Sequence, residues 1–319
     1  MIPLCEVEHK HEQKELSKDD IDFIDFFEQR IKKTIEDYEM VKPNDKLVVA
    51  VSGGKDSTAV LWVMKKLGYD VEAVTVDAHI GCYTQKNLEN IRTVCNTLKV
   101  SLHELPFRKI FGASLCYIRD MLKAKGHDLK SCTVCGVLRR SLLNKKSREL
   151  GATKLVMGHN LDDEAQAFVM NLFKNRLELS ARMGPVNGKN QEGFVSRIKP
   201  LYFTPEKDVI RYSQLMQFPV HIGKCPCSVE GFRNQVKDFL NRMELQNKNV
   251  KQTIVSYVLK NVSKIKNNPQ TLNDCSLCGE PCAEQQCRPC QILSYLKEPF
   301  EGGNLGVSES PEFAALQKA

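Results

Sequence analysis

A run of glycines, hydroxyls and charged side chains is the first candidate for chemistry in this chain of 319 residues. Residues 48–60, VVAVSGGKDSTAV, place two glycines, a lysine and an aspartate between an apolar run and a helical pattern. Glycines directly after a strand and before a helix let backbone N–H groups converge on an anion, and the helix N-terminus favours phosphate. The GxxxxGK frame of a Walker A loop is absent. The segment therefore predicts a phosphate-binding loop of another kind.

Cysteines are the second candidate, because the chain has thirteen of them. Disulfides are not expected, since the N-terminus lacks the pattern of a secretory signal and a reducing cytosol keeps thiols reduced. Metal binding or thiol chemistry is predicted instead. Cys132 and Cys135 form one C-x-x-C pair, and Cys225 and Cys227 lie in the run KCPC. Three further cysteines stand apart and are interpreted as small core residues: Cys82, Cys95 and Cys116.

The C-terminal region has the cysteine spacing of a structural zinc site. Its run C-x2-C-x8-C-x2-C consists of Cys275, Cys278, Cys287 and Cys290. Two such pairs supply the four thiolates that a tetrahedral Zn²⁺ takes in a zinc ribbon. Cys282 lies between the pairs and could compete as a ligand. The ribbon could contact RNA, or it could only hold the C-terminal region in place.

Alternating strand and helix patterns must position these groups. Strands are expected over residues 47–51, 71–76, 101–105 and 155–157, and helices over residues 21–38, 56–67, 86–98, 138–150, 162–173, 205–216, 232–245 and 250–262. This alternation predicts an α/β fold with a doubly wound parallel sheet. The stretch MGPVNGKNQEG, residues 183–193, is expected to be a mobile loop.

Five regions are expected along the chain. They are an N-terminal segment and helix (1–42), a catalytic domain (43–230), a helical region (231–270), a zinc ribbon (271–298) and a loosely ordered tail (299–319). Hydrophobic residues make up 42% of the chain, and no apolar run approaches the roughly 18 residues of a membrane helix. We therefore expect a cytoplasmic protein that has no membrane partner. The net charge of +7 permits contact with a polyanion.

The phosphate loop resembles that of the N-type ATP pyrophosphatases, the adenine nucleotide alpha hydrolase-like fold. The residues that carry the resemblance are Ser52, Gly53, Gly54, Lys55, Asp56 and Ser57. Members of this superfamily split ATP between its α and β phosphates. The resemblance implies further nucleotide contacts from Ala50, Val51, Val76, Gly158 and Asp163, with the adenine edge near the backbone of Val76.

Three more motifs narrow the resemblance. The motifs KSCTVCGVLRR, MGHNLDDEA and KCPC, together with the C-terminal ribbon, are similar to the tRNA 2-thiolation family. They are most similar to the branch that includes the archaeal and eukaryotic cytosolic wobble-uridine thiolases and the bacterial enzyme that acts on the T-loop uridine, so the target uridine, wobble or T-loop, stays open. The resemblance covers about residues 21–297. It implies that ATP with Mg²⁺ adenylates C2 of a tRNA uridine and that sulfur enters to give 2-thiouridine. The catalytic residues that it implies are Cys132, Cys135, Cys225, Asp163, Lys55 and Arg139.

The resemblance implies that Cys132, Cys135 and Cys225 hold a 4Fe-4S cluster with one iron left open. Two alternatives remain, a zinc ion on the three cysteines or a persulfide and disulfide pair of Cys132 and Cys225. Cys227 could replace Cys225 as a ligand. Arg140 competes with Arg139 as the cation at this site. Asp163 could instead only cap a helix.

Two other functions also remain open, an amidating tRNA enzyme like the lysidine synthetases and an RNA-binding metal module without catalysis. The immediate sulfur source could be a ubiquitin-like thiocarboxylate carrier or free sulfide, and a homodimer is a further possibility. Lysines and arginines such as those of KNR, residues 174–176, are expected to bind tRNA phosphates. Family members often have an N-terminal zinc site, but the spacing of Cys5, His9 and His11 is poor, so no metal is assigned there.

Overall fold

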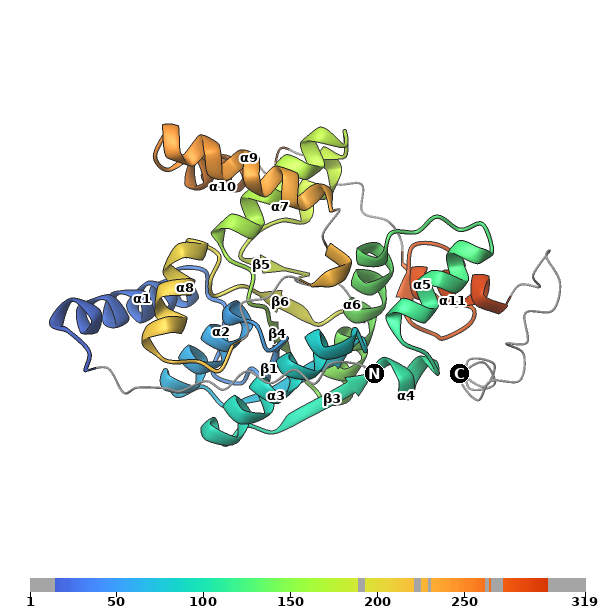
Figure 1. Ribbon diagram of the computed structural model, residues 1–319, viewed down its shortest axis with the longest axis horizontal. Helices are drawn as coiled ribbons and strands as arrows, with labels where there is room; N and C mark the ends of the chain where they lie inside the picture. The colour runs from blue at the N-terminus through green and yellow to red at the C-terminus, as the bar shows by residue number, and fades with distance from the viewer. Residues whose placement is uncertain are drawn as a thin grey trace.

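The computed structural model describes residues 15–188, 193–220, 225–228, 231–261, 264 and 272–297. A six-stranded sheet lies at its centre, with strand order β3-β2-β1-β4-β6-β5 (Figure 1). The strands are β1 Leu47–Ala50, β2 Val71–Asp77, β3 Leu102–Pro106, β4 Lys154–Val156, β5 Val186–Asn187 and β6 Ser196–Ile198. Cys5, His9 and His11, to which no metal was assigned, and the expected tail lie outside the described residues.

The strand order reverses beside β1, and this reversal positions the site. Chain order runs outward from β1 to β2 and β3 on one side and to β4 and β6 on the other, and these pairings are parallel. In an open parallel sheet, ligands bind where the order reverses, outside the carboxyl ends of the strands. The expected doubly wound sheet is therefore present, and the place where such sheets bind ligands lies beyond β1 and β4.

One edge of the sheet differs from the sequence prediction. The strand β5 pairs antiparallel with β6, although only parallel strands were expected. Part of the predicted loop over residues 183–193 forms β5, and residues 189–192 lie outside the described part of the chain. An antiparallel edge on a parallel sheet is common, because a short return strand needs no crossover helix.

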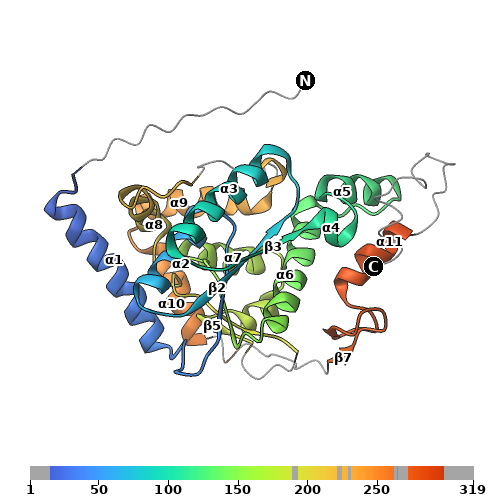
Figure 2. The ribbon, with the colours of Figure 1, turned by 90° about the horizontal axis from the view of Figure 1, so that it is seen from below.

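Helices cover both faces of the sheet and extend beyond it (Figures 1 and 2). They are α1 Lys18–Asp37, α2 Lys55–Lys66, α3 Gly81–Leu98, α4 Phe107–Phe111, α5 Leu115–Ala124, α6 Ser131–Glu149, α7 Leu161–Phe173, α8 Glu206–Leu215, α9 Phe232–Gln246, α10 Val250–Asn261 and α11 Arg288–Lys297, with 3-10 turns η1 Leu177–Arg182 and η2 Pro226–Ser228. The sequence pattern missed α4, α5 and α11. It also placed the start of α6 near residue 138, whereas the helix begins at Ser131.

Two apolar clusters sandwich the sheet. Val49 and Val156 pack with α1, α2, α3 and α8 on one face, whereas Val48 and Leu155 pack toward α6 on the other. Residues in the central strands are buried on both faces, which explains why the strands read as continuous runs of valine rather than as an alternation. A third cluster joins α4, α5, α6 and α11 at the end of β2.

The cysteine-rich segment forms a small unit beside α5 and α6. Strands β7 Asn273–Asp274 and β8 Pro281–Cys282 pair antiparallel, and α11 follows them and contacts α5 and α6 (Figure 2). The helices α9 and α10 instead pack against α7, on the opposite side of the molecule (Figure 1). Across the residues that the structure describes, no helix combines the length and the apolar character needed to span a bilayer.

The N-terminal helix α1 is fastened to the domain by an aromatic stack. The rings of Phe27 and Tyr212 lie 4.1 Å apart between centroids with a 12° interplanar angle, and Phe27 is fully buried. The hydroxyl of Tyr212 also donates to Glu28 Oε1 at 2.8 Å. Helix α1 is therefore part of the folded core, as its amphipathic pattern predicted.

We predict that Phe27→Ala lowers the free energy of unfolding by about 3 to 5 kcal/mol, because it removes a buried ring and leaves a cavity. The neighbouring Phe26 is 56% exposed, so Phe26→Ala is the matched control and is expected to cost below about 1 kcal/mol. Urea denaturation of both variants measures the difference. Equal losses in the two variants would show that α1 does not depend on this stack.

Candidate active site

The phosphate loop is held in shape by its own serines. Ser57 Oγ donates to Gly54 O at 3.1 Å and accepts from the backbone N–H of Ser52 at 3.0 Å. The hydroxyls of Ser52 and Ser57 lie 3.1 Å apart. These bonds join the end of β1 to the first turn of α2, so the loop has a defined conformation before any ligand binds. The predicted strand, glycine loop and helix N-terminus are thus found together.

Two glycines are required by close contacts around this loop. Gly53 has a φ of +76°, and a Cβ there would lie 2.0 Å from the backbone oxygen of Asn87. Gly158 follows β4, and a Cβ there would lie 2.9 Å from the backbone nitrogen of Ser57. The motif after β4 therefore packs directly on the phosphate loop after β1.

Lys55 lies between two carboxylates. Its Nζ is 2.9 Å from Asp56 Oδ2 and 3.0 Å from Glu206 Oε1. Burial by itself lowers the pKa of Lys55, but Asp56 and Glu206 raise it more strongly, to about 12. Lys237 also pairs with Glu206, at 2.7 Å. The predicted phosphate-binding cation is therefore present and charged, and Glu206 anchors it from α8.

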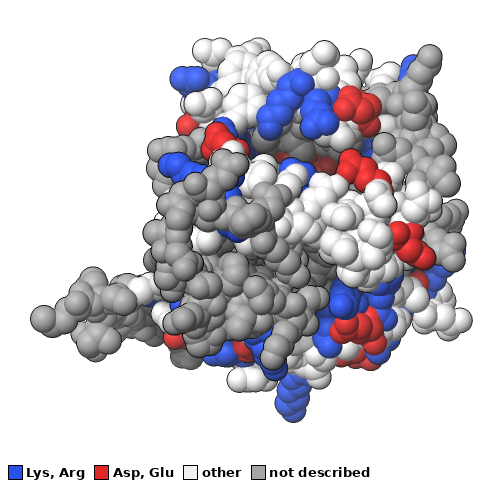
Figure 3. Space-filling model, turned by 90° about the vertical axis from the view of Figure 1, so that its right-hand side faces the viewer, with Lys and Arg blue, Asp and Glu red and all other residues white. Residues whose placement is uncertain are grey.

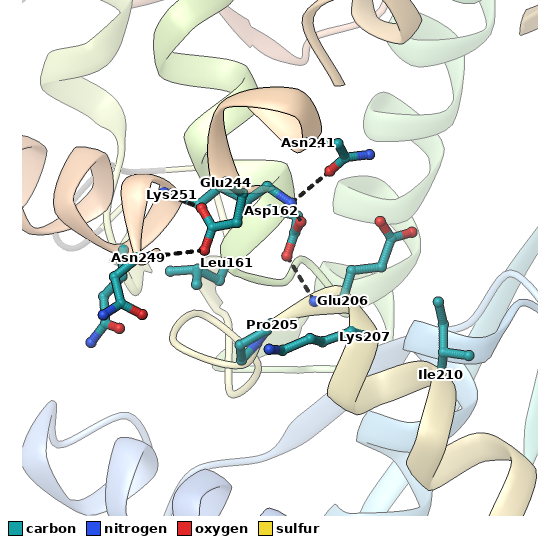
Figure 4. Close-up of a pocket in the computed structure, with 11 residues that line it drawn as sticks. Leu161, Asp162, Pro205, Glu206, Lys207, Ile210, Asn241, Glu244, Asn249 and Lys251 are labelled. Carbon is teal, nitrogen blue, oxygen red and sulfur yellow. Dashed lines mark hydrogen bonds and ion pairs between the residues drawn. The ribbon is translucent and has the colours of Figure 1, made fainter. Parts of the chain in front are cut away.

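A cavity of about 280 Å³ lies next to Glu206, between α7, α8, α9 and α10 (Figure 4). In it, Asp162 Oδ2 accepts from the backbone N–H of Glu206 at 2.7 Å, and Asp162 Oδ1 forms an ion pair with Lys251. Lys251 also donates to Asn241 Oδ1 at 2.7 Å. These bonds connect α9 and α10 to Glu206, the residue that anchors Lys55.

Asp163, the predicted catalytic aspartate, takes part in a capping box. Its Oδ2 accepts from the backbone N–H of Asn160 at 3.3 Å, and its own N–H donates to Asn160 Oδ1 at 3.0 Å. Its other oxygen accepts from Arg233 at 2.8 Å. The cap that was considered as an alternative is therefore formed, and it holds the carboxylate in a fixed orientation.

Asp163 also lies near Asp56. Burial raises the pKa of Asp56, Lys55 opposes this rise, and the carboxylate of Asp163 adds to it. Asn160 Nδ2 donates to Asp56 Oδ1 at 2.8 Å, which connects the two motifs directly. Two carboxylates thus face each other beside the phosphate loop.

His159 is a buried neutral base that the sequence pattern did not single out. The residue as a whole is only partly buried, but its Nδ1 is fully buried and has no hydrogen-bond partner in the structure. Burial, with the positive charges of Lys199, Arg233 and Arg197, lowers the pKa of His159 to about 3. The imidazole is therefore uncharged at neutral pH.

Arg139 reaches the crevice at the end of β2. Its guanidinium donates to the backbone oxygen of Val76 at 2.8 Å, and its Nε is buried without a partner. The carbonyl near which the adenine edge was expected is therefore engaged by Arg139 in this structure. Arg140 also lies near Cys135, whose thiol pKa it lowers, and it lines a second pocket with the cysteine-rich unit.

The cysteines of the two separate motifs converge. Cys132 and Cys135 lie in the first turns of α6, and η2, which follows Cys225, contacts α6 (Figure 1). Cys132 Sγ donates to the backbone oxygen of Cys227 at 3.4 Å. Burial raises the pKa of both Cys132 and Cys135, and the nearby Cys225 thiol raises both further, whereas Arg139 lowers that of Cys135.

The location of this cysteine group matters for chemistry. Cys135 and Cys225 pack on the same apolar cluster as Val76, at the carboxyl end of β2. Arg139, which bonds Val76, also lies close enough to Cys135 to affect its thiol. The cysteine group and the phosphate loop therefore belong to the same end of the sheet.

The four C-terminal cysteines are arranged around one point. Their Sγ atoms all lie within 4.8 Å of one another, and Cys278 and Cys287 are separated by 3.6 Å. Four thiolates at about 2.3 Å from one Zn²⁺ in a tetrahedron have sulfur separations of this order. Cys287 N donates to Cys275 Sγ at 3.2 Å, a bond that stabilises a thiolate. Cys282 is not in this group and donates to Glu284 O at 2.9 Å.

The sequence analysis did not single out several residues at the site, most of which only the tertiary structure brings there. They come from distant elements: Asn87, His159, Asn160, Lys199, Glu206, Arg233 and Lys237. Only His159 and Asn160 had a possible signal, since both lie inside the GHNLDDEA motif.

Comparisons with known proteins show the family to which the chain belongs. A family model described as a PP-loop domain matches residues 25–241. The chain is 32% identical to a tRNA-5-methyluridine(54) 2-sulfurtransferase of Thermotoga maritima, over 86% of this chain and 90% of that protein. It is 30% identical to the tRNA 2-thiolation protein NcsA of Haloferax volcanii, over 85% and 90% of the two chains. The chain belongs to the PP-loop tRNA 2-thiolation family.

A solved relative has the same architecture. The U34-tRNA thiolase NcsA of Methanococcus maripaludis, solved with its 4Fe-4S cluster, superposes with a TM-score of 0.72 at 26% identity, over 87% of this chain and 88% of that one. The expected membership of the PP-loop tRNA 2-thiolation family is thus confirmed, and so is the fold that was expected with it.

We predict that Gly53→Ala disrupts the phosphate loop and that Gly68→Ala does not. Both glycines have positive φ, so both variants carry about 1 to 2 kcal/mol of backbone strain. Only Gly53 also meets backbone at 2.0 Å, whereas Gly68 faces open space. Titration calorimetry with a non-hydrolysable ATP analogue should show at least about tenfold weaker binding for Gly53→Ala alone. Equal affinities in the two variants would show that the phosphate loop does not require a glycine at position 53.

The low pKa of His159 predicts a pH-dependent contribution to stability. In the unfolded state, His159 takes up a proton as the pH falls below its ordinary pKa of about 6.5. In the native state, the imidazole stays unprotonated until about pH 3. Native stability is therefore lost as the pH falls, by about 1.4 kcal/mol per unit, or about 2 kcal/mol by pH 5. Urea denaturation at pH 7 and pH 5 should show this extra loss in the wild type but not in His159→Asn. An equal loss of stability in the wild type and in His159→Asn would contradict the low native-state pKa of His159.

Proposed function

We propose that this chain is an ATP-dependent tRNA sulfurtransferase that converts a uridine to 2-thiouridine. The observation that supports it best is that the phosphate loop and the three-cysteine group belong to one end of the sheet, where Arg139 connects Cys135 with Val76 on β2, the strand beside β1. A base activated by the nucleotide and the sulfur that attacks it must meet within about 3 to 3.5 Å, so the two sites must share one crevice.

The nucleotide half of the site uses the phosphate loop and the motif after β4. Backbone N–H groups of the loop and Lys55 would bind the phosphates, and Gly158 allows the two segments to lie in contact. Asp56 and Asp163 offer the hard oxygen ligands that Mg²⁺ prefers. The residues proposed to contact ATP are Ala50, Val51, Ser52, Gly53, Gly54, Lys55, Asp56, Ser57, Val76, Gly158 and Asp163.

The cysteine half fits a cluster with three protein ligands. Cys132, Cys135 and Cys225 come from two elements that contact each other, and their thiols affect one another. A 4Fe-4S cluster bound there would supply one iron without a protein ligand, where a sulfur atom could be held. Arg139 provides a positive charge beside Cys135, which favours an anionic sulfur species at this place.

The proposed reaction has two steps. In the first, the C2 oxygen of the uridine attacks the α-phosphorus of ATP, and pyrophosphate leaves. In the second, a sulfur nucleophile attacks C2, the bond from C2 to oxygen breaks, and AMP leaves with that oxygen. The target base must be flipped out of its stack to reach both groups.

The four-sulfur group in the C-terminal unit is proposed to bind a structural Zn²⁺. Cys275, Cys278, Cys287 and Cys290 close the coordination sphere with four thiolates, which is typical of a structural site rather than a catalytic one. Its role would be to stabilise the β7–β8 hairpin and to seat α11 on α5 and α6.

The proposed partner is tRNA, and the proposed location is the cytoplasm, as the name of the mouse relative, cytoplasmic tRNA 2-thiolation protein 1, also suggests. The sulfur source is either free sulfide or a ubiquitin-like thiocarboxylate carrier, and a homodimer is a further proposal. In the KNR stretch, Arg176 lies 3.6 Å from Glu178, and the ammonium of Lys174 lies 5.4 Å from the ring centroid of Phe232. Both side chains are near the surface, where they could exchange these contacts for phosphates.

We predict that Cys132→Ala lowers the yield of 2-thiouridine at least about a hundredfold, because it removes one of three thiolates that must act together. The assay incubates anaerobically purified protein with tRNA, ATP and sulfide, and measures nucleosides by mass spectrometry. Iron content and visible absorption report the cluster. Cys82→Ala is the matched control, since Cys82 lies on α3 and outside the cysteine group.

Each other outcome points to another function. Unchanged turnover in Cys132→Ala, with nitrogen rather than sulfur in the product, would indicate an amidating enzyme. If the wild type releases no AMP from ATP in the presence of tRNA, the chain is a binding module without this catalysis.

A further inference from the structure

A second pocket lies between the catalytic domain and the cysteine-rich unit. Its volume is about 470 Å³, within the range of ligand sites, and its walls come from α6, from β6 with the residues before it, and from residues 280–291. It is distinct from the crevice beyond β1 and β4, because its lining includes neither the phosphate loop nor the three-cysteine group. None of the sequence motifs described above assigns a role to this pocket.

Two arginines dominate this pocket. Arg140 on α6 is exposed and Arg197 on β6 is partly buried, and desolvation by the surrounding protein lowers the pKa of each guanidinium. The two guanidinium groups lie near each other, and the positive charge of Arg140 lowers the pKa of Arg197 further. Among the residues that the structure describes, neither guanidinium forms an ion pair or a hydrogen bond. Two close positive charges without an acidic partner repel each other in the ligand-free protein.

The acidic side chains of the same pocket contact other residues and do not pair with these two arginines. Glu280 forms an ion pair with Arg148, and Glu284 accepts from Gln291 at 2.5 Å. Arg182 and Arg288 add further positive charge to the lining. The pocket therefore has an excess of guanidinium groups, the side chain that matches the geometry of phosphate oxygens best.

One outer face of the molecule has a mixed charge. Figure 3 views the side of the molecule on which α5 and α11 lie, and on its described part Lys and Arg side chains form separate groups interspersed with Asp and Glu. Paired surface charges of this kind contribute little to binding a particular phosphate. The unpaired arginines inside the pocket are the stronger candidates.

We propose that this pocket binds a backbone phosphate of the tRNA through Arg140 and Arg197. The inference rests on the proposed function, because a tRNA substrate makes a polyanion rather than a free anion the expected ligand. Cys132 and Arg140 lie eight residues apart on α6, which is about 12 Å along the helix. A tRNA strand anchored in the pocket would thus be held within a few nucleotides of the cysteine group.

The test is tRNA binding by Arg197→Gln and Arg140→Gln, measured by fluorescence anisotropy over a series of salt concentrations. Each variant is expected to weaken binding about three- to tenfold and to reduce the slope of log K against log salt by about 1, the effect of losing one phosphate contact. Arg92→Gln is the matched control. It removes the same charge from α3, where Arg92 is exposed and pairs with Glu104 at 2.7 Å, and its slope should stay that of the wild type.

Two further readouts separate a binding role from a structural one. Without RNA, Arg197→Gln should melt at the same temperature as the wild type or higher, because it relieves the repulsion from Arg140. A structural arginine would instead lower the melting temperature. Its affinity for the ATP analogue should be that of the wild type, since Arg197 does not line the phosphate loop.

The proposal is overturned if both variants bind tRNA with the affinity and salt slope of the wild type. It is also overturned if they lose affinity for inorganic pyrophosphate alone, or if thiolation falls while tRNA affinity stays unchanged, because the pocket would then serve a free anion or the sulfur donor. If the wild type binds tRNA through Arg197 but makes no 2-thiouridine, the phosphate site is supported and the sulfurtransferase proposal fails.

Discussion

The contact between two loops at the point where the strand order reverses is the constraint on which the site depends. The backbone after β4 approaches the first turn of α2 so closely that Gly158 cannot carry a side chain without meeting Ser57. Asn160 then bonds Asp56, and Asp163 faces the same carboxylate. Because β1 and β4 are neighbours in the sheet, two motifs about a hundred residues apart in the sequence become one phosphate site.

Charge balance around this contact differs between the two halves of the molecule. On the α8 side, Lys55 is paired with Asp56 and Glu206, and α9 and α10 are joined to this group through Asp162 and Lys251. On the α6 side, Arg139, Arg140 and Arg197 lack acidic partners among the described residues. The first arrangement stabilises the fold, whereas the second leaves positive charge available to an anionic ligand. Helix α6 carries the cysteine pair together with Arg139 and Arg140, so it connects sulfur chemistry with anion binding.

Much of the fold could be predicted from local patterns. The valine runs of β1 and β2 and the amphipathic α1 were placed within a few residues of their observed ends, because buried parallel strands and surface helices have strong periodicities. Helix α6 was placed too late, since its buried residues are few and include Asn144 and Ser147. Helices α4 and α5 were missed although Phe111, Leu115, Ile118 and Leu122 have helical spacing. The β5 edge is too short to leave a pattern.

For the chemistry, the sequence by itself identified the residues that form short motifs. The glycines of the loop, the C-x-x-C pair and the four C-terminal cysteines are recognisable because their function depends on short spacings along the chain. Only the tertiary structure decided which distant groups meet them: Glu206 on Lys55, Arg233 on Asp163, and Arg197 beside Arg140. Such pairs depend on how elements pack across the sheet, and packing between distant segments leaves no spacing for a sequence to show.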